Sequence, residues 1–173
     1  PRMRLSGLVE RIGEAPILSA RDGDGMPIAA PAAAAGAGVD HAAAVAQVLD
    51  LVKARHPEAS IDAVGHRVVH GGPVYAAPTL VDDAALAELE RFEPFAPLHQ
   101  PHNLAGVRAA MRAFPSAIQV ACFDTAFHRS HPFVNDTFAL PRAYFDKGVR
   151  RYGFHGLSYD YISGTLAEQA PTL

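Results

Sequence analysis

The most informative stretch of the chain is Gly65-His66-Arg67-Val68-Val69-His70-Gly71-Gly72. Residues 59–64, which precede it, are β-branched and apolar and predict a strand that runs into this stretch. Side chains alternate between the two faces of a strand, so Arg67 and Val69 are expected to share one face. A guanidinium beside an apolar side chain, followed by two glycines, suits a small carboxylate with a short hydrocarbon tail. The structural alternative is an arginine that forms a salt bridge near a glycine turn.

The composition describes a soluble globular chain. It has 173 residues, 49% of them apolar, and a formal net charge of −3, which provides no basic stripe for nucleic acid. No apolar run reaches the roughly 18 residues of a membrane helix, and no charged-then-apolar leader opens the chain. Cys122, the single cysteine, lies in an apolar run and is expected to be an inert core thiol. These features favour a cytoplasmic protein that binds neither nucleic acid nor membrane.

The order of predicted elements indicates an α/β fold with a partly parallel sheet. Strands are predicted at residues 4–12, 15–20, 61–69 and 117–123, the last one buried, and helices at 40–55, 81–91, 103–114 and 158–168. Residues 21–25 are expected to form a turn, and the Ala/Gly/Pro tract at 29–38 a mobile loop.

Two helices have predicted inner faces. Asp40 is expected to cap the first helix, and His56 and Pro57 to end it. Its inner face is predicted to consist of Val45, Val48, Leu49 and Val52. In the second helix Leu86 and Leu89 are predicted to point inward.

Three further side chains are candidates for chemistry. Asp124 follows a predicted strand directly, at the end where ligands bind in α/β sheets; the alternative is that it caps the next turn. His99 lies in a proline-bounded loop before a helix, where it can help to bind an oxyanion or hold the turn by bonding to the backbone. His155 lies between two closely spaced glycines, exposed enough to face a transferring phosphoryl group.

The chain has nine histidines, which makes a metal site an alternative. The pairs His99/His102 and His128/His131 have i,i+3 spacing. Both pairs fall in proline-broken loops, with no carboxylate or cysteine at a spacing typical of zinc sites. No metal ligand is therefore expected in this chain.

Taken together, these segments resemble the acetate kinase family. Five motifs occur in the order seen there, at residues 65–72, 96–103, 123–128, 144–145 and 150–156, and residues 7–13 are similar to the family's early strand. The resemblance implies a ribonuclease-H-like lobe of the acetate and sugar kinase, heat-shock-70 and actin superfamily, incomplete, with a mixed sheet and flanking helices. It also implies reversible phosphoryl transfer from ATP to acetate with Mg²⁺, giving acetyl phosphate and ADP.

The resemblance assigns roles residue by residue. Arg67 matches the arginine that binds the carboxylate or phosphate of the acyl substrate. The matches for catalysis are Asp124, which orients or assists the attacking carboxylate, and His155, which stabilises the phosphoryl transition state. His99 matches the histidine of the acyl-phosphate pocket. The apolar pocket around the acetate methyl group is matched by Val69, Leu98 and Phe154.

The sequence also departs from the family. The opening Asn-x-Gly-Ser-Ser-Ser strand and the nucleotide-binding second half are not found, so the chain alone is expected to be inactive. Tyr159 stands where the family usually has a second histidine, and Gln100 replaces an asparagine. The expected division is an acyl-substrate lobe at residues 1–127, lacking its first strands, and the crossover to a second lobe at 128–173.

The sequence is also compatible with other functions. A propionate or butyrate kinase differs from an acetate kinase by small changes in one apolar pocket. A non-catalytic binding or assembly module is a further possibility. The resemblance implies that the full-length protein is a homodimer.

Overall fold

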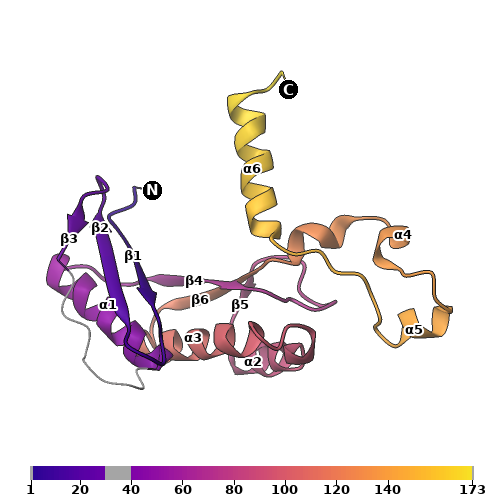
Figure 1. Ribbon diagram of the computed structural model, residues 1–173, viewed down its shortest axis with the longest axis horizontal. Coiled ribbons are helices and arrows are strands. Elements are labelled where there is room, and N and C mark those ends of the chain that lie inside the picture. Colours follow the sequence, from indigo (N-terminus) through magenta and orange to yellow (C-terminus); the bar gives the residue numbers. More distant parts are fainter. Residues whose placement is uncertain (1, 30–39, 173) are drawn as a thin grey trace. The chain divides into compact units, whose positions relative to one another are not determined.

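The computed structural model describes residues 2–29 and 40–172 (Figure 1). These residues form two compact units. Unit 1 comprises Pro1–Asp62 and Ala105–Ala117, and unit 2 comprises Ala63–Leu104 and Ile118–Leu173. Helix α3 (Gln100–Ala113) contributes its first residues to unit 2 and the rest to unit 1. The loop predicted at residues 29–38 lies, apart from its first residue, outside the described residues.

Unit 1 contains an antiparallel sheet with the order β1-β2-β3. Its strands are β1 (Leu5–Glu10), β2 (Ile17–Asp22) and β3 (Pro27–Ile28). The strands predicted at residues 4–12 and 15–20 are confirmed, and they pair antiparallel as a hairpin. The turn predicted at residues 21–25 begins later, because Asp22 ends β2 and its carboxylate accepts hydrogen bonds from the N–H groups of Asp24 and Met26.

Helix α1 (His41–Arg55) of unit 1 begins and ends as predicted. The Asp40 carboxylate caps it by accepting a hydrogen bond from the Ala43 N–H at 2.9 Å. The predicted inner face is wrong, because Ala44 and Leu51 are the buried residues and Val48 is 39% exposed. Alanines occupy several positions around this helix. Alanine is small enough to be buried in close packing but is also common at exposed positions, so the valine positions alone do not identify the buried face.

Unit 2 contains the mixed sheet that carries the site. Its strands are β4 (Ala63–Val68), β5 (Thr79–Leu80) and β6 (Ile118–Phe123), in the order β4-β6-β5. β4 runs parallel to β6, side by side with it in Figure 1, and β5 pairs antiparallel with the other edge of β6. Because β4 and β6 are parallel, the residues that follow them emerge at the same edge of the sheet. The predicted α/β fold with a mixed sheet is confirmed.

The helices of unit 2 are mostly short. They are α2 (Asp83–Glu90), η1 (Glu93–Phe95), η2 (Ala126–Ser130), α4 (Phe133–Asp136), α5 (Arg142–Asp146) and α6 (Gly156–Gln169). In α2, Leu86 and Leu89 are buried as predicted. α3 begins three residues before its predicted start, because proline is tolerated in a first helical turn and Pro101 therefore does not delay it.

β6 buries only one of its faces, which corrects the prediction of a wholly buried strand. Every second side chain of the strand is buried, namely Gln119, Ala121 and Phe123. Ile118, on the other face, is exposed. Cys122 lies on the less buried face and is half-buried rather than part of the core. In the part of the chain that the structure describes, no helix is both long and apolar enough to cross a membrane.

Candidate functional site

A cavity of about 540 Å³ lies where β4 and β6 end, within unit 2. It is lined by Arg67, Val69, Phe95, Ala96, His99, Asn103, Asp124, Phe154 and His155. Every candidate named from the sequence lines this cavity except Leu98, which is 80% exposed and lies outside the lining. Phe95, Ala96 and Asn103 were not singled out, although the last two belong to the motif at residues 96–103.

Arg67 and Asp124 form a bidentate ion pair in this cavity. Arg67 Nε donates to both carboxylate oxygens, at 3.1 and 3.0 Å, and Nη2 donates to Oδ2 at 2.8 Å. These hydrogen bonds and the adjacent negative charge raise the pKa of the Arg67 guanidinium further above its usual range. The Arg67 side chain remains 60% exposed while that of Asp124 is 4% exposed. The guanidinium is therefore oriented by a buried carboxylate and still open to a ligand.

Asp124 is held at its position through its backbone. Its N–H donates to the carbonyl of Val68 at 3.0 Å, which extends the pairing of the two parallel strands by one residue. Its carbonyl accepts from the Gly156 N–H at 2.8 Å. A side chain at Gly156 would collide with this carbonyl and with Phe127, so only glycine allows the approach. The carboxylate bonds to Arg67 and does not cap η2, which lacks a side-chain cap.

His155 reaches the cavity through an unusual backbone conformation. Its φ of 57° lies in the left-handed region, directly before α6. The ring of the neighbouring His128 contacts the Phe154 carbonyl at 3.0 Å and supports this turn. The imidazole of His155 is exposed, as the flanking glycines predicted. His99 is also exposed, at the junction of η1 and α3.

The backbone beneath the cavity is held by side chains. Four consecutive N–H groups, from Val69 to Gly72, each donate to a side-chain acceptor. In order, the acceptors are Asn103 Oδ1, Gln100 Oε1, Thr125 Oγ1 and His70 Nδ1. The buried Gln100 amide also donates to the carbonyls of His70 and Leu89. These contacts give Gln100 and Asn103 a clear structural role at the end of β4.

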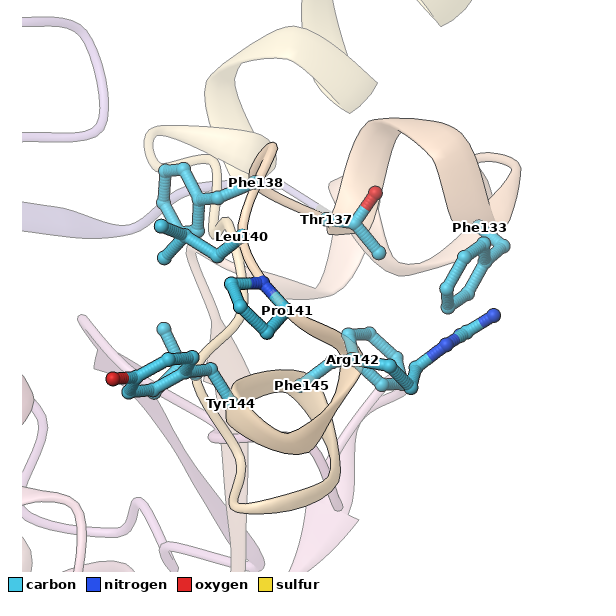
Figure 2. A pocket seen from close by; sticks show the side chains of 9 residues that line it. Phe133, Thr137, Phe138, Leu140, Pro141, Arg142, Tyr144 and Phe145 are labelled. Atoms are coloured by element: carbon cyan, nitrogen blue, oxygen red, sulfur yellow. The ribbon is translucent and has the colours of Figure 1, made fainter.

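Three other residues of the resemblance lie outside this cavity. Tyr159 packs against Phe127 and His128, with ring centroids 5.9 and 5.7 Å away, and does not line the cavity. Tyr144 and Phe145 line a second cavity of about 160 Å³, shown in Figure 2. There the Arg142 guanidinium lies 4.3 Å from the centroid of the Phe133 ring.

The cavity offers little to a metal ion. Among the described residues, no group of three or more His, Cys, Asp or Glu side chains is arranged to hold one. Both oxygens of Asp124 already accept hydrogen bonds from Arg67. The exposed Arg67 guanidinium and the apolar side chains beside it provide chemistry that suits an anion with an apolar tail.

Solved structures of acyl kinases share this architecture. The acetate kinase of Porphyromonas gingivalis superposes with a TM-score of 0.80 at 36% identity, over 95% of this chain and 42% of that one. A propionate kinase of Francisella tularensis superposes with a TM-score of 0.82 at 30% identity, with the same coverage of 95% and 42%. The similarity to both structures shows that this chain has the fold of the acetate and sugar kinase, heat-shock-70 and actin superfamily, as predicted from the sequence.

Comparison of the amino-acid sequence with known proteins narrows this superfamily to one family. The acetokinase family profile matches residues 1–171. The acetate kinase of Methylocella silvestris is 51% identical over 166 residues, which is 95% of this chain and 41% of that protein. The chain belongs to the acetokinase family. It spans about two fifths of the length of the curated relatives it matches.

Proposed function

We propose that this chain is part of an acetate kinase, which reversibly transfers the γ-phosphoryl group of ATP to acetate and forms acetyl phosphate and ADP. The observation that carries the proposal is the cavity at the end of β4, where an exposed, oriented Arg67 lies beside the apolar Val69 and Phe154. A guanidinium matches a carboxylate or an acyl phosphate, and the apolar side chains match a short hydrocarbon tail.

The proposed catalysis rests on positioning and on charge. Acetate is already ionised at neutral pH, so its attack on phosphorus needs no general base. Arg67 holds the carboxylate of the substrate, and Asp124 keeps the guanidinium in place through its bidentate hydrogen bonds. His155 and His99 face the same cavity and supply hydrogen bonds to phosphoryl oxygens, where charge accumulates in the transition state. Leu98 remains a predicted member of the methyl pocket.

The proposal includes ATP and Mg²⁺, which the family implies. The described residues of this chain do not fit the ion, since Asp124 is fully engaged by Arg67 and no other acidic side chain lines the cavity. We place the nucleotide and metal sites in the three fifths of the full-length relatives that this chain does not cover.

Mutation of Arg67 tests the proposal directly in the full-length protein. We expect Arg67→Ala to lower acetyl phosphate formation by at least about a hundredfold, because Arg67 is the only Arg or Lys side chain among the described residues that line the cavity. The matched control is Arg55→Ala, at the exposed end of α1, which should change turnover less than twofold. Unchanged kinetics of Arg67→Ala would refute the assignment of this residue.

A propionate kinase is the second candidate, favoured by the superposition on the Francisella tularensis structure. Acetate is preferred because the relatives with 44–51% identity are acetate kinases. Comparison of kcat/KM for acetate, propionate and butyrate decides between them. A higher value for propionate would replace the proposed substrate.

The wider proposal covers the setting of the enzyme. It places the full-length protein in the cytoplasm as a homodimer, with an acyl-substrate lobe at residues 1–127 and the crossover at 128–173. Residues 1–173 alone are proposed to be inactive, and kinase activity of this segment would contradict that point. The alternative of a non-catalytic module requires a full-length protein that forms no acetyl phosphate at all.

A further inference from the structure

His70 lies at the centre of an aromatic cluster behind the cavity. It follows Val69 on the opposite face of the strand end and is 1% exposed. Four rings surround its imidazole, with centroid distances of 4.5 to 6.2 Å. They belong to Phe92, Phe95, Tyr152 and Phe154.

Two of these rings form the apolar wall of the cavity. Phe95 and Phe154 line it and are 51% and 37% exposed. Their centroids lie 5.2 and 5.7 Å from that of His70. The two side chains come from distant parts of the sequence, and both rings contact the same imidazole.

The imidazole itself is firmly held. Its Nδ1 accepts a hydrogen bond from the Gly72 N–H at 2.8 Å, and Gln100 binds both backbone groups of His70. Burial, with a smaller effect of the Arg129 charge, lowers the pKa of His70 to about 4, so the ring is neutral at physiological pH. Histidine is the side chain that provides an acceptor nitrogen within an aromatic ring, and here that nitrogen binds the Gly72 N–H.

We propose that His70 is a positioning residue that fixes the Phe95 and Phe154 rings and thereby sets the length of acyl chain that the cavity accepts. This inference rests on the proposed function. It assigns the apolar wall to Phe95 in addition to the residues predicted from the sequence. A displaced ring opens space for another methylene, which changes discrimination between acids by about 10- to 200-fold in a well-packed pocket.

The test is the acyl-chain selectivity of the full-length enzyme. His70→Asn keeps a side-chain acceptor for Gly72 but removes the ring. We expect the ratio of kcat/KM for acetate to that for propionate to fall about tenfold or more, through KM, while kcat for acetate changes less than threefold. A purely structural role would instead lower the thermal midpoint and leave the ratio unchanged.

A second variant keeps the test decisive if His70→Asn does not fold. Phe95→Leu leaves His70 in place, shortens the wall and should shift selectivity in the same direction. The matched control, Phe133→Leu, changes an exposed aromatic ring that does not line this cavity and should preserve the ratio. An unchanged ratio in Phe95→Leu overturns the inference even if acetate kinase activity is present. A wild-type protein that phosphorylates none of the acids would refute the proposed function instead.

Discussion

Gln100 shows how one buried side chain holds the end of a strand. Its carboxamide accepts a hydrogen bond from the His70 N–H and donates to the carbonyls of His70 and Leu89. The residue is completely buried, so water cannot replace these contacts. The amide therefore couples the start of α3 to the strand end that carries Val69 and His70.

Replacement of Gln100 by leucine tests this coupling. Gln100→Leu preserves the side-chain volume but leaves the N–H and the carbonyl of His70 buried without hydrogen-bond partners. We therefore expect the free energy of unfolding to fall by about 2–3 kcal/mol. Urea denaturation followed by circular dichroism measures the change. The same substitution at the exposed Gln169, in the last turn of α6, should cost less than about 0.5 kcal/mol. Equal effects at the two positions would contradict the role of Gln100.

At the scale of elements, α1 and α2 begin with the same kind of N-terminal aspartate cap. Asp40 and Asp82 each accept a hydrogen bond from the N–H three residues later, at 2.9 and 2.8 Å. The cap gives α1 a defined start even though its alanine-rich sequence marks no single inner face.

Removal of the first cap should destabilise α1. We expect Asp40→Ala to lower the free energy of unfolding by about 1 kcal/mol, because the Ala43 N–H loses its acceptor. Asp50→Ala, an exposed position inside the same helix, should be neutral or slightly stabilising. A thermal melt of the two variants beside the wild type measures the difference. A larger loss in Asp50→Ala would rule out the cap as the main effect.

At the scale of the whole molecule, the buried neutral His70 makes stability depend on pH. Its pKa is lowered from 6.5 to about 4 in the folded chain, so the unfolded chain binds the proton more tightly. Stability is unaffected by this group above pH 6.5 and falls as the pH decreases toward 4. The resulting loss in the free energy of unfolding, from above pH 6.5 to below pH 4, amounts to about 3 kcal/mol.

The comparison of His70→Asn with the wild type isolates this contribution. Both proteins share their other titrating groups, so the difference between their unfolding free energies should shrink as the pH decreases from 7 to 4.5. Urea titrations at several pH values provide these free energies. A difference that stays constant across this range would show that His70 does not carry the pH dependence.

The sequence by itself determined the features that depend on neighbouring residues. The alternation along β4 placed Arg67 and Val69 on one face, Asp40 marked the start of α1, and both glycines beside Phe154 and His155 indicated a tight turn. The ordered motifs indicated the family and most of the cavity lining. These signals act within a few residues, where backbone geometry leaves little choice.

Only the tertiary structure decided the contacts between distant segments. Arg67 and Asp124 are 57 positions apart, and the parallel pairing of β4 with β6 brings them together. The residues around η1 and those just before α6 pack their rings against His70, which no local pattern reveals. The buried face of α1 and the exposure of Leu98 likewise depend on which surfaces pack against them. Local periodicity shows which apolar side chains can share one face of an element. Whether such a face is buried depends on which other segment packs against it.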